Sequence, residues 1–148
     1  MMTECSEAIR RVATAINQLD GIYYLLGKRS GINENVLAIL SVMSNGEPHS
    51  QKEISDKYLI PRTTINSIIK SMLAEGYLSF CPGRQRKEKL LQLTPQGKAY
   101  AAAIRAEINL VETNAMTATL AVYPPDFIDA LEDYSERMFR ELNALPAK

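Results

Sequence analysis

Two short helical segments separated by a proline constrain the fold of this 148-residue chain more than any other feature. The first starts at Ser50, whose S-x-x-E spacing to Glu53 is that of a capping box, and ends near Tyr58. Pro61 disfavours helical geometry at the residue before it and presets φ for a new helix, so the second segment runs from about Pro61 to Ala74. Two helices of this length with so tight a turn predict a helix-turn-helix.

After Gly76 the apolar period changes from that of a helix to two, which predicts strands at Leu78–Phe80 and Leu91–Leu93. The residues between them, 84–89, are charged and form the expected tip of a hairpin. A helix-turn-helix followed by a basic hairpin predicts a winged helix.

Long helices are expected on both sides of this region. Apolar residues recur at helical spacing over residues 5–28, and Asn33 is a good N-cap for the helix that precedes Ser50. Thr94-Pro95 starts a further helix that reaches about Ala121, and a last one follows the prolines at 124 and 125. The predicted fold is mainly α with a small β-hairpin wing.

The charge distribution favours a nucleic-acid partner although the net charge is zero. Residues 1–49 carry four basic and five acidic side chains, residues 50–100 nine and four, and residues 101–148 four and eight. The middle third alone is therefore positive, and a local basic surface decides whether phosphates are attracted.

The second helix of the pair is the one that enters the major groove in a helix-turn-helix. Its apolar face is expected to be buried, and its other face carries small hydrogen-bonding side chains and cations, the types that contact bases and phosphates. The preceding helix N-terminus and the hairpin tip add phosphate contacts. The candidate DNA-binding residues are Gln51, Lys52, Arg62, Thr63, Thr64, Asn66, Ser67, Lys70, Arg84, Gln85, Arg86 and Lys87.

Each of these features has an ordinary alternative. Short helix pairs occur in proteins that do not bind DNA, basic hairpin tips are usually solvated loops, and a polar helix face is usually only an exposed one. Their combination in this order favours a sequence-specific DNA binder. The alternative is a winged helix that binds proteins, which would expose apolar residues between Arg62 and Lys70.

The chain resembles the MarR family of bacterial transcription regulators. The resemblance is carried by Ser50 to Leu78, with its Leu-Ala-Glu-Gly-Tyr-Leu ending, and by the L-x-L-T-x-x-G run from Leu91 to Gly97. It implies a homodimeric regulator, here expected to repress. One difference concerns the wing: the family's Asp-x-Arg positions hold Gln85 and Lys87, so Arg84 or Arg86 is expected to replace the usual arginine.

The apolar stripes of the first, fifth and sixth helices also favour a homodimer, because a winged helix of this size covers little of them. We therefore expect residues 1–32 and 95–148 to form a dimerisation region and residues 33–94 the DNA-binding domain. Two recognition helices related by a two-fold axis would bind a pseudo-palindromic site.

The resemblance further implies a small-molecule effector, often a phenolic or other anionic compound, although each candidate residue can equally be structural. The candidate ligand-binding residues are Tyr23, Tyr24, Lys28, Arg29, Met43 and His49. Two distant cysteines and one histidine predict no metal site and no cofactor, and no catalytic motif indicates an enzyme. Without a signal-like N-terminus or a long apolar run, the protein is expected to be cytoplasmic.

Overall fold

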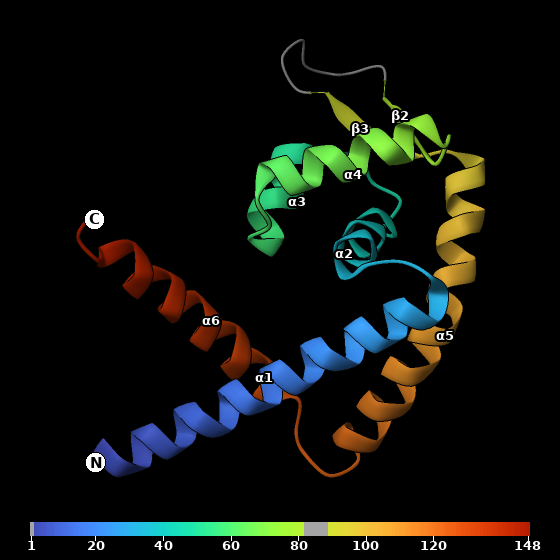
Figure 1. Ribbon diagram of the computed structural model, residues 1–148. Coiled ribbons are helices and arrows are strands. Elements are labelled where there is room, and N and C mark those ends of the chain that lie inside the picture. The colour runs from blue at the N-terminus through green and yellow to red at the C-terminus, as the bar shows by residue number, and fades with distance from the viewer. Residues whose placement is uncertain (1, 82–88) are drawn as a thin grey trace. The chain divides into compact units, whose positions relative to one another are not determined.

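The computed structural model describes residues 2–81 and 89–148, and within them the chain forms six helices and three short strands (Figure 1). In chain order these are α1 (Met2–Ser30), α2 (Glu34–Met43), β1 (His49–Ser50), α3 (Gln51–Tyr58), α4 (Arg62–Ala74), β2 (Leu78–Phe80), β3 (Leu90–Leu93), α5 (Pro95–Leu120) and α6 (Asp126–Ala144). They fall into two compact units, Met1–Ala106 and Glu107–Lys148. The predicted fold, mainly helical with a small β wing, is confirmed.

Side-chain caps start three helices where the sequence predicts them. Asn33 Oδ1 accepts from the Val36 amide at 3.0 Å, and Ser50 Oγ accepts from the Glu53 amide at 3.1 Å. Thr94 Oγ1 accepts from the Gly97 amide at 2.9 Å at the start of α5. Each bond satisfies one of the amides that the first turn of a helix leaves without a partner, and this fixes the helix start.

The turn between α3 and α4 is tight because Leu59 adopts a left-handed conformation with φ of 52°. The Ile60 amide then donates to the Ser55 carbonyl at 3.1 Å, and the Ser55 hydroxyl donates to the Ile60 carbonyl. Pro61 is extended, with ψ of 138°, so α4 begins at Arg62, one residue later than predicted. This turn sets the orientation of α4 relative to α3.

The sheet contains one strand that the sequence did not predict. β3 lies in the middle, with antiparallel pairing to β2 (Leu78 opposite Leu93) and to β1 (His49 opposite Leu91). β1 has only two residues, too few to show an alternating pattern, and depends on hydrogen bonding to β3. The wing is therefore joined directly to the residue that caps α3.

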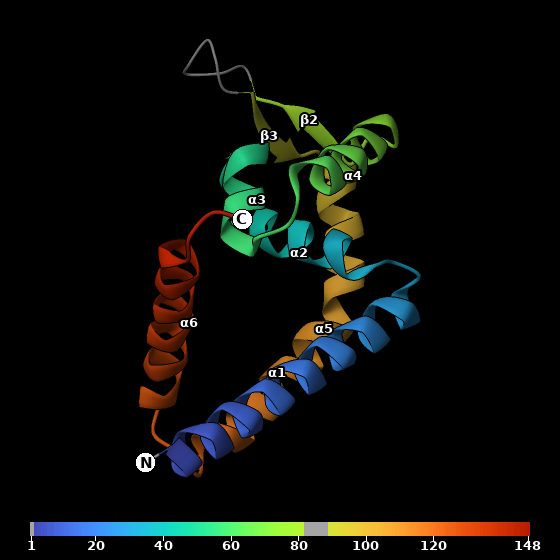
Figure 2. The same cartoon turned by 60° about the vertical axis from the view of Figure 1, so that its left-hand side comes forward.

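The first unit has its core between α2, α3, α4 and the sheet. Figures 1 and 2 show α3 and α4 next to one another, with β2 beside α4 and β3 paired to β2. The fully buried side chains of these elements are Ile39, Leu40, Ile54, Ile65, Ile69 and Leu91. On α4, Met72 is also buried. Ile68 and Leu73 belong to the apolar face that was expected to be buried, but they are half-buried because each lines a pocket beside the helix. The other face of α4 is left for solvent or a partner.

Hydrogen bonds between the Leu-Ala-Glu-Gly-Tyr-Leu segment and the L-x-L-T-x-x-G run fix the start of α5 against the end of α4. The Thr94 hydroxyl donates to the Gly76 carbonyl at 2.6 Å, and the Thr94 amide donates to the Tyr77 carbonyl at 3.1 Å. A Cβ on Gly97 would lie 1.9 Å from the Tyr77 oxygen, so only glycine fits there. Gly76 itself has φ of 81° and ends α4.

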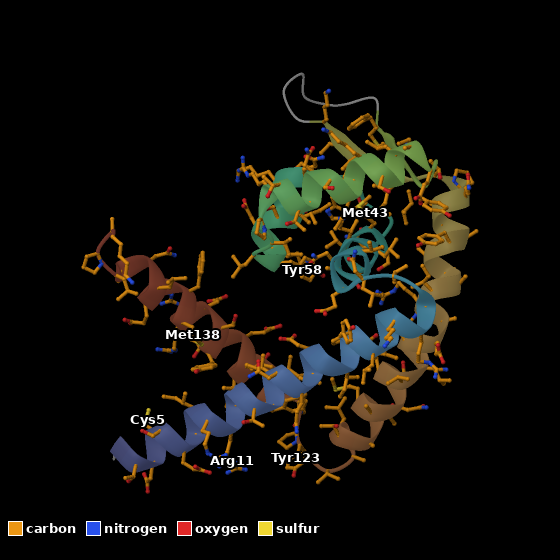
Figure 3. All side chains as sticks on the ribbon, viewed as in Figure 1. Cys5, Arg11, Met43, Tyr58, Tyr123 and Met138 are labelled. Atoms are coloured by element: carbon orange, nitrogen blue, oxygen red, sulfur yellow. The ribbon has the colours of Figure 1, made fainter. Side chains whose placement is uncertain are left out.

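In the second unit α6 has no buried residue. It is amphipathic, and its large apolar side chains are all substantially exposed, Met138 among them (Figure 3). Within the described ranges no helix is both long and apolar enough to cross a membrane.

Candidate nucleic-acid interface

Helix α4 presents a polar face opposite its buried isoleucines. Arg62, Thr63, Ser67 and Lys70 are exposed, while Thr64 and Asn66 are half-buried. No large apolar side chain of α4 is exposed. The face that the sequence assigned to DNA is therefore accessible and carries cations and hydrogen-bonding groups along its length.

A groove of about 520 Å³ lies between the start of α3, helix α4 and the two strands of the wing. Its lining residues are Ser50, Gln51, Lys52, Asn66, Lys70, Leu73, Phe80 and Lys89. Three of the eight are lysines and none is acidic, so the groove has the electrostatics of a site for an anion or a polyanion. It brings together four predicted residues from two helices: Gln51, Lys52, Asn66 and Lys70.

The lysine and the aromatic ring from the wing were not among the predicted site residues. The Nζ of Lys89 lies 5.4 Å from the centroid of the Phe80 ring, within the range of a cation–π interaction. Phe80 was predicted only as a strand residue, and Lys89 only as the last residue of the charged hairpin tip. An aromatic side chain at the last residue of a strand beside a basic hairpin was the available signal.

Lys52 has an anionic neighbour in the free protein. Its Nζ lies 2.8 Å from Asp56 Oδ2, one turn further along α3. The hydrogen bond from Lys52 lowers the pKa of the Asp56 carboxyl, and the positive charge of Arg62 adds to the effect. Both side chains are exposed. A phosphate at the start of α3 would therefore compete with Asp56 for this lysine.

The predicted wing-tip residues Arg84, Gln85, Arg86 and Lys87 lie outside the described residues. Their DNA contacts, including the replacement of the usual wing arginine, stay predictions. The structure does describe the strands that lead into and out of the tip. Cys81, at the end of β2, donates from Sγ to Gln92 Oε1 at 2.9 Å.

The six predicted ligand-binding residues differ in accessibility. Tyr23, Tyr24, Lys28 and Arg29 are exposed on the last turns of α1. Met43 is buried at the end of α2 (Figure 3), and His49 is buried in β1. A ligand would reach the last two only if the surrounding side chains moved.

His49 is held by hydrogen bonds at both ring nitrogens. Nδ1 lies 2.8 Å from Glu53 Oε1, and Nε2 lies 2.9 Å from Asn45 Oδ1. Asn45 Oδ1 also accepts from the Glu47 amide at 2.9 Å, which supports its assignment as the oxygen. The side chain was predicted as a ligand-binding or structural residue, and in the structure it connects the turn after α2 to the first turn of α3.

A second pocket of about 290 Å³ lies on the other flank of α4, next to the α1–α2 connection. Tyr77 and Tyr100 stack there with ring centroids 4.1 Å apart. Burial raises the pKa of the Tyr100 hydroxyl, and Tyr77 and Glu75 act in the same direction. None of the six predicted ligand-binding residues lines this pocket.

Among the described residues, no group of histidine, cysteine, aspartate or glutamate could hold a metal ion.

Residues 30–87, which contain α2, α3, α4 and β2, match the sequence model of the MarR family. This winged-helix region belongs to the MarR family. The family consists of DNA-binding transcription regulators and not of enzymes. No curated protein sequence matches the chain.

Solved MarR-family structures have the same fold over nearly the whole chain. A MarR family regulator from Neisseria meningitidis, NMB1585, has a TM-score of 0.79 at 23% identity, covering 92% of this chain and 96% of its own. BldR from Sulfolobus solfataricus has a TM-score of 0.69 at 17% identity, covering 92% and 97%. MarR from Staphylococcus aureus, solved in complex with salicylate and kanamycin, has a TM-score of 0.69 at 15% identity, covering 97% and 95%. At these identities the similarity shows the fold.

Proposed function

We propose that this MarR-family protein is a sequence-specific repressor that binds a pseudo-palindromic duplex operator as a homodimer. The observation that carries the proposal is the cationic groove beside the exposed polar face of α4. Base-reading and phosphate-holding groups then lie side by side on one surface, as recognition of a specific duplex requires.

The side chains of this surface divide into two roles. Thr63, Thr64, Asn66 and Ser67 are short hydrogen-bonding groups on α4 and suit base edges in the major groove. Lysines and arginines flank them and suit phosphates, which fix the register of the helix on the duplex. The predicted tip residues, Arg84 to Lys87, would extend these contacts into the minor groove.

The proposed dimer would use residues 1–32 and 95–148, with residues 33–94 as the DNA-binding domain. Support comes from apolar side chains that the chain leaves uncovered. Ile9, Ile16 and Leu19 on α1 are exposed, and so are Leu131 and Met138 on α6. Large apolar side chains left exposed along a helix are typical of an interface, and a second copy related by a two-fold axis would place two α4 helices on two half-sites.

We further propose that a small aromatic or anionic effector releases the operator. The salicylate in the S. aureus MarR structure supports an effector of this class. Tyr23, Tyr24, Lys28 and Arg29 offer aromatic rings and cations on one helix end, and Met43 and His49 lie in the adjoining DNA-binding domain.

Selection of bound sequences from random duplexes tests the operator and its symmetry together. We expect an enriched inverted repeat, bound more weakly as salt increases because phosphate contacts release counterions. The double variant Arg62→Ala/Lys70→Ala should enrich no motif while keeping the wild-type melting temperature. Arg137→Ala/Arg140→Ala removes the same charge from α6 and serves as the control. The proposal would be contradicted if the wild-type protein bound no duplex, or if its binding did not weaken as salt increases.

The alternative of a protein-binding winged helix has less support. Such a module would expose apolar residues between Arg62 and Lys70, and none of the large ones in this segment is exposed. Enrichment of no sequence together with salt-independent binding of a protein partner would favour that alternative.

A further inference from the structure

We infer that the groove between α4 and the wing receives the sugar–phosphate backbone of one DNA strand, with the Phe80 ring packed against a deoxyribose. This inference rests on the proposed function and adds to it a residue and the part of the DNA that this residue contacts. It starts from one aromatic side chain that the core leaves uncovered.

The alternation of side chains along β2 determines on which face of the strand Phe80 lies. Side chains two apart on a strand share a face, so Phe80 lies on the same face of β2 as Leu78. Leu78 is 3% exposed, whereas Phe80 is 47% exposed. Leu73 of α4 is half-buried and lines the same groove. Together the two side chains form an apolar floor.

The rim of this floor is cationic. Lys52, Lys70 and Lys89 come from α3, α4 and the wing, and among the described lining residues there is no carboxylate. Lys89 is held near the ring face, with Nζ 5.4 Å from the Phe80 centroid. A ligand that fits must therefore present negative charges on either side of an apolar unit.

A DNA strand has this alternation along its backbone. Each deoxyribose is an apolar ring between two phosphates, and the apolar floor with lysines around it matches that order in charge and polarity. The 2′-hydroxyl of a ribose would be brought against an aromatic ring without a hydrogen-bond partner, which is unfavourable. The site therefore favours DNA over RNA, and it contributes affinity without sequence information.

The test measures binding of Phe80→Ala and Phe80→Leu to the selected operator and to a scrambled duplex of equal length and composition. Loss of a half-buried aromatic contact should weaken both complexes by about the same factor, roughly tenfold for alanine and less for leucine. Tyr58→Ala removes an exposed aromatic residue at the end of α3, outside the groove (Figure 3), and should leave both affinities unchanged. Melting temperatures equal to wild type show that the variants are folded.

A second measurement replaces single deoxyribonucleotides of the operator by ribonucleotides. We expect one position in each half-site where the ribose weakens wild-type binding but does not weaken the already reduced binding of Phe80→Ala. Lys89→Gln should lower the slope of affinity against salt by about one phosphate contact, while Lys98→Gln, an exposed lysine outside the groove, should not.

The outcomes separate this inference from the proposed function. If the wild-type protein binds the operator and Phe80→Ala binds equally well, only the inference is overturned. If Phe80→Ala weakens operator binding but not scrambled-duplex binding, the ring contacts bases and the sugar assignment is wrong. If the wild-type protein binds no duplex, both are overturned.

Discussion

The winged-helix region and helix α6 are both amphipathic, but only the first covers its apolar residues within the chain. Ile65 and Ile69 of α4 are completely buried, whereas Leu131 and Met138 of α6 are about half exposed. An amphipathic pattern therefore predicts the helix in both places, but it does not say what covers the helix. For α4 the cover is the rest of its own unit, and for α6 we expect a second copy of the chain.

The largest effect should come from opening the covered core. Ile69→Ala removes a fully buried side chain from the contact between α4 and its neighbours and should lower the free energy of unfolding by about 4 kcal/mol. Leu131→Ala, an equally large truncation on α6, should cost less than 1 kcal/mol at concentrations where the chain is monomeric. Urea denaturation followed by circular dichroism measures both. Equal losses would contradict the distinction between the two regions.

A charge on the uncovered helix should act on association instead of folding. Leu131→Asp would place a carboxylate in the proposed dimer contact and should weaken dimerisation by about 3 kcal/mol, or roughly a hundredfold in the dissociation constant. Sedimentation velocity over a range of concentrations measures it. Glu132→Lys, at the neighbouring exposed position, is the control. An unchanged dimer, or a wild-type protein that is monomeric throughout, would show that α6 is not the contact.

The stability of the winged-helix region should also depend on its buried polar side chains. The His49 side chain is 7% exposed and hydrogen-bonded at both nitrogens, to Glu53 and to Asn45. His49→Gln cannot make both bonds and should lower the free energy of unfolding by about 2 kcal/mol. Asn45→Ala removes the bonds that its Oδ1 accepts from His49 and from the Glu47 amide, and should also cost about 2 kcal/mol. Thermal unfolding followed by circular dichroism compares them. No loss in either variant would mean that this cluster does not hold α3 to the preceding turn.

The features predicted from sequence are those that neighbouring residues determine. The caps at Asn33, Ser50 and Thr94 each act within three residues, and all three form as predicted. The burial of Ile65 and Ile69 follows from a helical period within α4 alone. The residues that determine these features lie close together in the sequence, so the features can be predicted without knowledge of tertiary contacts.

The features that were missed depend on residues far apart in the chain. β1 exists because His49 pairs with Leu91, forty-two positions later, and its burial follows from that pairing. The groove needs Lys52, Lys70 and Lys89 from three elements at once. Phe80 looked like an ordinary strand residue, because its exposure depends on how β2 packs in the folded unit, which the strand sequence alone does not show.

The smallest expected effect concerns the ion pair that Lys52 of the groove forms with Asp56 in the absence of DNA. Asp56→Asn removes the carboxylate that pairs with Lys52 and should tighten operator binding by about twofold near neutral pH, because an exposed ion pair contributes little. Lys52 lowers the pKa of Asp56, so the pair is intact above the usual carboxyl range and is lost as pH falls through the lowered value.

Below that value the wild-type carboxyl is protonated, and the difference between wild type and Asp56→Asn should disappear. Fluorescence anisotropy with a labelled operator over a pH series measures this convergence. Asp133→Asn releases Arg137 on α6 in the same way and should leave affinity unchanged at every pH, because no residue of α6 is assigned to the proposed DNA contact. If both variants increased operator affinity equally, the effect would come from the change in the net charge of the protein. The release of Lys52 in the groove would then not be its cause.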